Sequence, residues 1–137
     1  MIIGSNSENK EIEKRVAITP DIVKKYKDLG FEINLVKNYA DHIGFSDKLY
    51  TDAGAQIIND ENELIKNSDI IVQMNMFDEN QISIMKENQT LVGSFNSNQN
   101  KDIILKLYSR KINVFSLELL PRITRAQSMD VLSSQSN

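Results

Sequence analysis

Residues 19–36 read Thr19-Pro20-Asp21-Ile22-Val23-Lys24-Lys25-Tyr26-Lys27-Asp28-Leu29-Gly30-Phe31-Glu32-Ile33-Asn34-Leu35-Val36, a helix signal followed directly by a strand signal. Thr19 is a favourable N-cap, and Pro20 suits the first helical position because its fixed φ is already helical. Gly30 is placed to end the helix in a left-handed conformation. The residues after it alternate apolar and polar, as expected of a strand. This segment therefore predicts a helix that leads into a strand.

The same alternation continues along the whole chain. Short apolar runs of strand length occur at 1–4, 31–36, 56–58, 69–74, 90–95 and 112–117. Five helix starts lie between them, at Thr19, Ser46, Asp60, Asp78 and Asn100. In the last helix, the spacing predicts one apolar face made of Ile103, Ile104, Leu107 and Tyr108. Strands that alternate with helices predict an α/β domain of the Rossmann-like or flavodoxin-like type, with five or six strands in an open, mostly parallel sheet and helices on both faces.

The glycines do not form a nucleotide-binding fingerprint. The chain has five of them, Gly4, Gly30, Gly44, Gly54 and Gly93, and no two are close enough for G-x-G-x-x-G or a phosphate loop. We therefore expect an α/β domain that lacks its own glycine-rich dinucleotide site.

Composition excludes several classes of protein. The 137 residues carry a net charge of −3 and no basic stripe, so we expect no nucleic-acid partner. Cysteine is absent, which excludes disulfides and thiolate metal sites. No apolar run approaches the roughly 18–20 residues that span a bilayer, and the first residues do not resemble a secretory signal. A soluble, cytoplasmic protein without direct membrane insertion is expected.

Arg15 is the first candidate for chemistry. It precedes the strand-like segment 16–18 and the capped helix at Thr19. A guanidinium near a helix N-terminus can bind an anion such as a carboxylate. The alternative is a salt bridge with Glu11 or Glu13, and the spacing favours neither.

Other reactive side chains favour ordinary roles. His42 is the only histidine, and as a loop residue without a second ligand it is expected to be solvated. Asp60, Glu61 and Glu63 form an acidic cluster at a helix start, where helix capping is the expected role, with a capping box between Asp60 and Glu63. Met74 and Met76 lie in an apolar strand-like run and are expected to fill the core. No metal site is predicted.

The end of the chain is its most polar and best equipped part. Residues 114–120 read as a strand, which Pro121 ends because it has no N–H for the ladder. Arg122 follows on a loop, and Gln127 and Asp130 share a face if their segment is helical, with Ser133 continuing it. Together they offer groups that can bind a carboxamide and an acidic group. A solvated, capped helix start is the alternative.

Two stretches carry a family resemblance. Glu13-Lys14-Arg15-Val16-Ala17-Ile18-Thr19-Pro20 resembles the opening signature of the alanine dehydrogenase and transhydrogenase superfamily. The tail Pro121-Arg122-Ile123-Thr124-Arg125-Ala126-Gln127-Ser128-Met129-Asp130-Val131-Leu132-Ser133-Ser134-Gln135-Ser136-Asn137 is similar to the alpha subunits of proton-translocating NAD(P) transhydrogenases. Residues 45–47 and 52–55 also fit, so the resemblance covers the whole chain.

This resemblance implies a function. Residues 1–124 would be the N-terminal domain of an NAD(H)-binding alpha subunit, and 125–137 would start an interdomain helix that leads to an absent dinucleotide domain. Arg122, Gln127 and Asp130 would form a catalytic and cofactor-binding loop at the nicotinamide, with Ser133 nearby. Hydride would pass from NADH to NADP+ on a partner subunit, coupled to proton translocation, and neither a metal nor a side-chain base is required.

The resemblance also implies partners. These are a transhydrogenase beta subunit, a membrane component and a second alpha subunit in a homodimer, with the assembly peripheral to the inner membrane. Alone, the chain is expected to be inactive. The competing interpretation is a truncated remnant, or a non-catalytic subunit-interaction module whose last helix exposes Met129, Val131 and Leu132.

Alanine dehydrogenase is the enzymatic alternative within the same superfamily. Arg15 matches that enzyme's substrate arginine, but its substrate lysine falls at Asn75 and its catalytic histidine at Asn96. Asparagine can neither carry the lysine's charge nor shuttle a proton. The chain also departs from the usual transhydrogenase pattern in two places. Transhydrogenases usually carry Pro-Lys-Glu after the first strand, where this chain has Asn6-Ser7-Glu8. They usually carry a basic residue and prolines near the position of Asn75.

Overall fold

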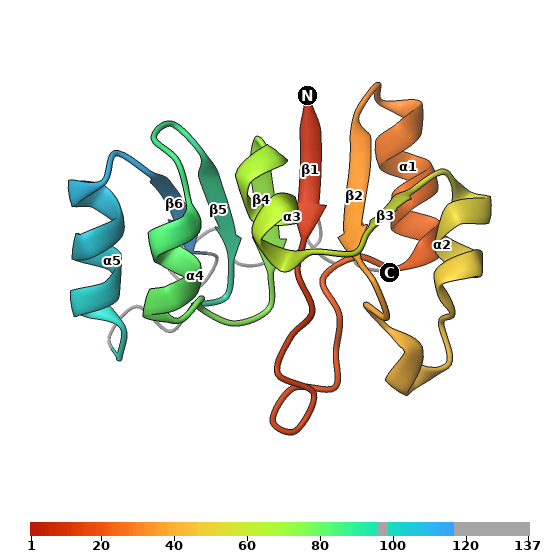
Figure 1. The fold of residues 1–137 in the computed structure, drawn as a ribbon, viewed down its shortest axis with the longest axis horizontal. Helices are drawn as coiled ribbons and strands as arrows, with labels where there is room; N and C mark the ends of the chain where they lie inside the picture. Colours follow the sequence, from red (N-terminus) through yellow and green to blue (C-terminus); the bar gives the residue numbers. More distant parts are fainter. Residues whose placement is uncertain (96–98, 117–137) are drawn as a thin grey trace, which may run out of the picture.

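The computed structural model describes residues 1–95 and 99–116. These residues form a six-stranded, all-parallel sheet with the order β3-β2-β1-β4-β5-β6 (Figure 1). The strands are β1 Ile2–Ser5, β2 Glu32–Val36, β3 Gln56–Ile58, β4 Ile70–Gln73, β5 Thr90–Gly93 and β6 Asn113–Ser116. The predicted α/β fold with a parallel sheet is confirmed.

Five α-helices connect the strands: α1 Pro20–Asp28, α2 Asp47–Ala53, α3 Glu61–Asn67, α4 Glu79–Ile84 and α5 Lys101–Ser109. A short 3-10 turn, η1, spans Asp41–Ile43. Parallel strands joined by right-handed crossovers place α1 and α2 on one face and the remaining helices on the other. The contacts agree, since α1 packs on α2 and α3 packs on α4.

All five predicted helix starts are confirmed as N-cap positions. Thr19, Ser46, Asp60 and Asp78 each accept a backbone N–H within the first turn of the helix that follows, whereas Asn100 shows no side-chain capping bond. These bonds satisfy donors that the helix itself leaves free. Gly30 and Gly54 end α1 and α2 with φ of 97° and 114°, a region that glycine enters without strain.

Three local predictions were wrong. The strand-like segment 16–18 does not join the sheet, because buried tyrosine side chains bond the backbone of Ala17 and Ile18 instead. Asp60 caps α3 through the N–H of Asn62, and the reciprocal capping box occurs at the start of α4. Tyr108 is 53% exposed, because α5 turns Leu107 rather than Tyr108 into the core.

Side chains of the strands alternate between the two faces of the sheet. One is the α3 face, where a Cβ on Gly4 would collide with Ser68 and approach Leu64 of α3. The opposite one is the α1 face, onto which Ser5 points to meet Tyr39. The register places a row of side chains across this α1 face: Ile3, Ile33, Leu35, Ile57, Ile70, Val72, Val92 and Phe115.

Strand order reverses between β1 and β4. These two strands are neighbours, although three helices and two strands separate them in sequence. In open α/β sheets, ligands bind beyond the carboxyl ends of the strands at such a switch point. The fold therefore directs attention to the loops that follow Ser5 and Gln73.

Some predictions fall on residues outside the described part of the chain. They concern Asn96 and the whole of residues 117–137, including Arg122, Gln127, Asp130 and Ser133. Over residues 1–95 and 99–116, no helix is long and apolar enough to cross a membrane.

Candidate functional site

A cavity of about 460 Å³ opens at the switch point. It lies where the loops after β1, β2 and β4 meet the first turns of α3 and α4. Its lining combines apolar side chains, such as Ile12, Val36 and Phe77, with carboxylates, amides and one lysine. The polar residues include Asn6, Glu8, Lys37, Glu61, Asn75 and Gln81. The fold thus gathers polar groups from segments far apart in the sequence at the carboxyl edge of the sheet.

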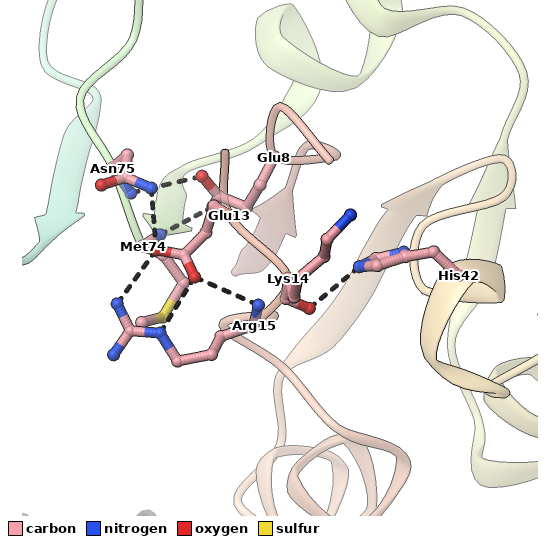
Figure 2. Close-up of polar contacts among 7 residues, drawn as sticks. All are labelled: Glu8, Glu13, Lys14, Arg15, His42, Met74 and Asn75. Atoms are coloured by element: carbon pink, nitrogen blue, oxygen red, sulfur yellow. Dashed lines mark hydrogen bonds and ion pairs between the residues drawn. The ribbon is translucent and has the colours of Figure 1, made fainter. Parts of the chain in front are cut away.

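Glu8 joins the two loops that flank the switch point. Its carboxylate accepts hydrogen bonds from the backbone N–H of Met74 at 2.7 Å and of Asn75 at 3.3 Å (Figure 2). It also accepts one from Nε2 of Gln73 at 2.9 Å. Burial raises the pKa of Glu8, and the charge of Glu13 adds to the rise, while the three hydrogen bonds oppose it. Desolvation disfavours the charged form, whereas donors to the carboxylate favour it.

Glu13 and Arg15 form a bidentate pair beside Glu8. Nε of Arg15 lies 2.9 Å from Oε2 of Glu13, and Nη2 lies 2.9 Å from Oε1. The backbone N–H of Arg15 donates to the same carboxylate. These bonds lower the pKa of Glu13 to about 2. Of the two possibilities for Arg15, the ion pair with Glu13 is the one observed.

Asn75 connects the two carboxylates. Its backbone N–H faces Glu8, and its side-chain Nδ2 donates to Oε1 of Glu13 at 3.0 Å (Figure 2). The two acids therefore share one asparagine while their pKa values move in opposite directions, Glu8 upward and Glu13 downward. Neighbouring acids whose pKa values are driven apart by their surroundings are typical of functional sites.

Amide side chains fix the rest of the cavity wall. Gln73 pairs with the backbone of Asn6, accepting its N–H at 2.6 Å and donating to its carbonyl at 3.1 Å. Glu61 accepts bonds of 2.7 Å from both Asn6 and Gln81. The first turns of α3 and α4 are thereby tied to the loop after β1.

Two buried tyrosines hold the segment that carries Arg15. The hydroxyl of Tyr39 accepts the N–H groups of Ala17 and Ile18, each at 3.1 Å, and lies 2.8 Å from Oγ of Ser5. Tyr50 donates to the carbonyl of Ile18 at 2.9 Å. Burial raises the pKa of both phenols, so they remain neutral donors and acceptors.

Of the remaining candidates, Asp60 and Met76 adopt the expected roles, whereas His42 is half-buried rather than solvated. Nε2 of His42 contacts the carbonyl of Lys14 at 2.9 Å. Asp60 caps α3, and Met76 packs against the core. In the described ranges, 1–95 and 99–116, no three His, Asp or Glu side chains cluster as metal ligands would.

Sequence reasoning did not identify Glu8, Gln73 or Tyr39 as site residues. The signal for Gln73 was available, because a polar residue at the end of an apolar strand, 3% exposed, needs buried partners. Glu8 and Tyr39 sit in polar segments that look solvated in sequence. Only the folded chain shows that both are buried.

Comparisons with known proteins agree on one family. The model of the family described as "Alanine dehydrogenase/PNT, N-terminal domain" matches residues 4–137. NAD(P) transhydrogenase subunit alpha of Haemophilus influenzae is 38% identical over the whole chain, which spans only 26% of that relative's length. Alanine dehydrogenase 1 of Staphylococcus aureus is 27% identical over 98% of the chain, which covers 36% of that protein.

A solved structure gives the same result. The crystal structure of transhydrogenase from Sinorhizobium meliloti superimposes with a TM-score of 0.86 at 31% identity. The match covers 98% of this chain and 40% of that one. The likeness therefore extends to the arrangement of strands and helices around the switch point.

Proposed function

Because the chain belongs to the alanine dehydrogenase/PNT N-terminal domain family, we propose that it works as the N-terminal domain of an NAD(P) transhydrogenase alpha subunit. The complete subunit would bind NAD(H) and pass hydride between NADH and NADP+, with the transfer coupled to proton translocation across a membrane. Residues 1–124 would form this domain, and 125–137 would lead toward a nucleotide-binding domain.

One observation carries the proposal: 38% identity over the entire chain to a transhydrogenase alpha sequence. The alanine dehydrogenase relative is more distant, at 27%. The chain spans 26% of the transhydrogenase relative, so catalysis would need the remainder of the subunit. The missing glycine-rich turn fits this division, because the adenosine and pyrophosphate would be held elsewhere.

In this proposal, Arg122, Gln127 and Asp130 form the loop that contacts the nicotinamide, with Ser133 beside it. NADP(H) would sit on a partner subunit. The network of Glu8, hydrogen-bonded across the switch point, would give that cleft a rigid wall. Direct hydride transfer needs orientation of two nucleotides rather than a side-chain base.

The proposed assembly contains a beta subunit, a membrane component and two alpha subunits. The domain would lie on the cytoplasmic side, peripheral to the inner membrane. Its net charge of −3 and the absence of a basic stripe fit contacts with protein rather than nucleic acid.

Alanine oxidation is disfavoured by the geometry at Asn75. That side chain is a neutral amide bonded to Glu13, and the guanidinium of Arg15 is paired with the same carboxylate. No cationic side chain at position 75 is available to hold a substrate carboxylate beside Arg15.

The test is hydride transfer from NADH to thio-NADP+ by the complete alpha subunit mixed with its NADP-binding partner. Gln127→Asn and Asp130→Asn should each slow the transfer by about 10²-fold, since misplaced reactants lose that much. Ser136→Ala is the matched control and should keep the wild-type rate. Unchanged rates in both loop variants would contradict the assignment.

The intact mass of the cellular polypeptide separates this proposal from a truncated remnant or interaction module. A species well above 15.6 kDa would place the domain in a larger subunit. A species at that mass would direct attention to a separate partner chain. Self-association lost on removal of residues 125–137 would then favour the interaction module.

A further inference from the structure

The loop between β4 and α4, here called the β4–α4 loop, forms one wall of the switch-point cavity. Two sets of hydrogen bonds hold the start of this wall. Gln73, the last residue of β4, bonds the backbone of Asn6 through its side-chain amide, at 2.6 and 3.1 Å. The next two residues, Met74 and Asn75, donate their backbone N–H groups to the carboxylate of Glu8. The amide cannot titrate, whereas the carboxylate can, so the two sets respond differently to pH.

Glu8 holds all of these donors only in its ionised form. An ionised carboxylate offers two acceptor oxygens, whereas protonation turns one oxygen into a donor. Oε2 of Glu8 accepts from Met74 at 2.7 Å and from Gln73 at 2.9 Å, and Oε1 accepts the N–H of Asn75 at 3.3 Å. The bond to Asn75 is the longest of the three and therefore the weakest. A proton is thus accommodated most easily on Oε1, where it displaces the N–H of Asn75.

Asn75 has a second partner that does not let go under the same conditions. Its Nδ2 donates to Oε1 of Glu13 at 3.0 Å. The bidentate pair with Arg15 keeps the pKa of Glu13 at about 2, so this carboxylate stays ionised at any pH at which Glu8 takes up its proton. A neutral Glu8 therefore leaves Asn75 attached through Glu13 and no longer through Glu8.

We propose that Glu8 is a positioning residue whose protonation state sets where the β4–α4 loop lies in the wall of the cavity. With Glu8 ionised, the loop is held at both Met74 and Asn75. With Glu8 neutral, Met74 stays bonded, Asn75 shifts with Glu13, and the wall is freed from Asn75 onward. Burial of Glu8 raises its pKa, which moves this change above pH 4.5.

The charged and titratable groups around Glu8 come from three segments. Glu13 and Arg15 lie on its own loop, and the charge of each acts on Glu8 or is affected by it. Tyr39 follows β2, and it stays neutral because burial raises the pKa of its phenol. The residues that Glu8 contacts after β4 are uncharged. The other charged residues that line the cavity are Lys37, Glu61 and Asp78.

The consequence for catalysis rests on the proposed function, in which the cavity belongs to the cleft that orients two nucleotides. A wall displaced at Asn75 would then slow hydride transfer without removing any group that touches the reactants, because small displacements of bound reactants are costly. The movement of the wall itself depends only on the hydrogen bonds of Glu8, Glu13 and Asn75. The two parts can therefore be tested separately.

NMR of the full 137-residue chain tests the movement through the backbone amide signal of Asn75, recorded as a function of pH. Glu8→Gln cannot titrate and reproduces the neutral form, since its amide has one acceptor oxygen and one donor nitrogen. Glu11→Gln is the matched control, the same substitution at an exposed position of the same loop. His42, which contacts the carbonyl of Lys14, also changes charge with pH, but its effect persists in both variants and is thereby separated.

In the wild type and in Glu11→Gln, the Asn75 signal should move with pH along a titration curve whose midpoint lies above 4.5. That curve should be lost in Glu8→Gln, with the signal at its low-pH position throughout. An Asn75 signal that titrates alike in Glu8→Gln and the wild type, or that does not move with pH in the wild type, would overturn the proposal.

Hydride transfer by the complete subunit and its NADP-binding partner tests the consequence. Well above the pH at which Glu8 titrates, Glu8→Gln should be slower than the wild type by about tenfold or more, and the gap should close as the pH falls. Glu11→Gln should follow the wild type. A gap that is constant with pH would give Glu8 a merely structural role and overturn its assignment as a proton-dependent positioning residue. Unchanged transfer in both Gln127→Asn and Asp130→Asn would contradict the proposed function, whereas the titration of Asn75 would still stand.

Discussion

The two halves of the sheet carry similar strands but differ in what supports them. On the α1 face, β1, β2 and β3 are covered by α1 and α2, and the loop before α1 is held by Tyr39 and Tyr50. The other half leaves Val92 and Phe115 outside the core on that face. Apolar strand residues thus do not by themselves make a core, because a helix must also lie over them.

The largest expected difference between the two halves is in the free energy of unfolding lost when an apolar strand side chain is truncated to alanine. Ile33→Ala should lower the free energy of unfolding by about 2–5 kcal/mol, because it leaves a cavity in packed surroundings. Val92→Ala, on the same face of β5, should cost about 1 kcal/mol or less, because Val92 lies outside the core cluster. Urea unfolding of both variants measures the contrast, and equal losses would show that Val92 is packed as tightly as Ile33.

The next largest effect concerns the tyrosine brace, the hydrogen bonds of Tyr39 and Tyr50 to residues 17–18. Tyr39→Phe removes the acceptor of two N–H groups and should cost about 1–3 kcal/mol, because the N–H of Ile18 is then buried without a partner. Tyr108→Phe, on the exposed side of α5, is the control and should stay within about 0.5 kcal/mol of wild type. If both variants unfolded alike, the brace would be unimportant.

A smaller, pH-dependent effect is expected at Glu8, which joins the two halves. Its pKa is raised in the folded state, so its contribution to stability is full below the ordinary value of 4.5 and is lost as pH rises through the raised value. Glu8→Gln cannot titrate. Relative to wild type, its stability should therefore improve between about pH 4 and pH 7.

Urea unfolding at both pH values tests this prediction. The groups whose charges act on Glu8 are Glu13, which adds to the rise in pKa, and Arg15 beside it. A stability difference that stays constant with pH would mean that Glu8 titrates in the folded protein as it does in the unfolded chain.

The smallest effect on the fold should come from Arg15→Ala. The pKa of Glu13 is about 2, so this carboxylate stabilises the fold above its ordinary value of 4.5, and the stabilisation is lost as pH falls toward 2. Removing the guanidinium should move the pKa of Glu13 back toward 4.5. Carboxyl NMR titration measures it, with Lys14→Ala as the control. A pKa still near 2 in Arg15→Ala would assign the shift to Asn75 instead.

Much of the fold could be predicted because its signals are local. Thr19, Ser46, Asp60 and Asp78 cap helices with donors only two or three residues away, so the sequence contains both partners. Gly30 and Gly54 likewise act through their own backbone angles. The strand-like segment at 16–18 was wrongly predicted because its partner, the hydroxyl of Tyr39, lies more than twenty residues away.

The candidate site could be predicted only in part. Arg15 was identified as a charged residue at a helix start, and its neighbour Glu13 was one of two acids named as partners. The role of Glu8 could not be seen, because its donors come from residues 73–75 and meet it only when β1 and β4 become neighbours. The assignments of Arg122, Gln127, Asp130 and Ser133 remain predictions.

The sequence by itself determined the order of helices and strands, the helix caps and the lack of a glycine-rich fingerprint. Residues 13–20 and the tail also indicated the family. Each of these depends on residues close together in the chain or on their identity alone. Only the tertiary structure decided that Glu8 and Glu13 share Asn75, and that β5 and β6 are left uncovered on one face by the described helices. Those features depend on strand order and on which helix lies over which strand, which no local pattern specifies.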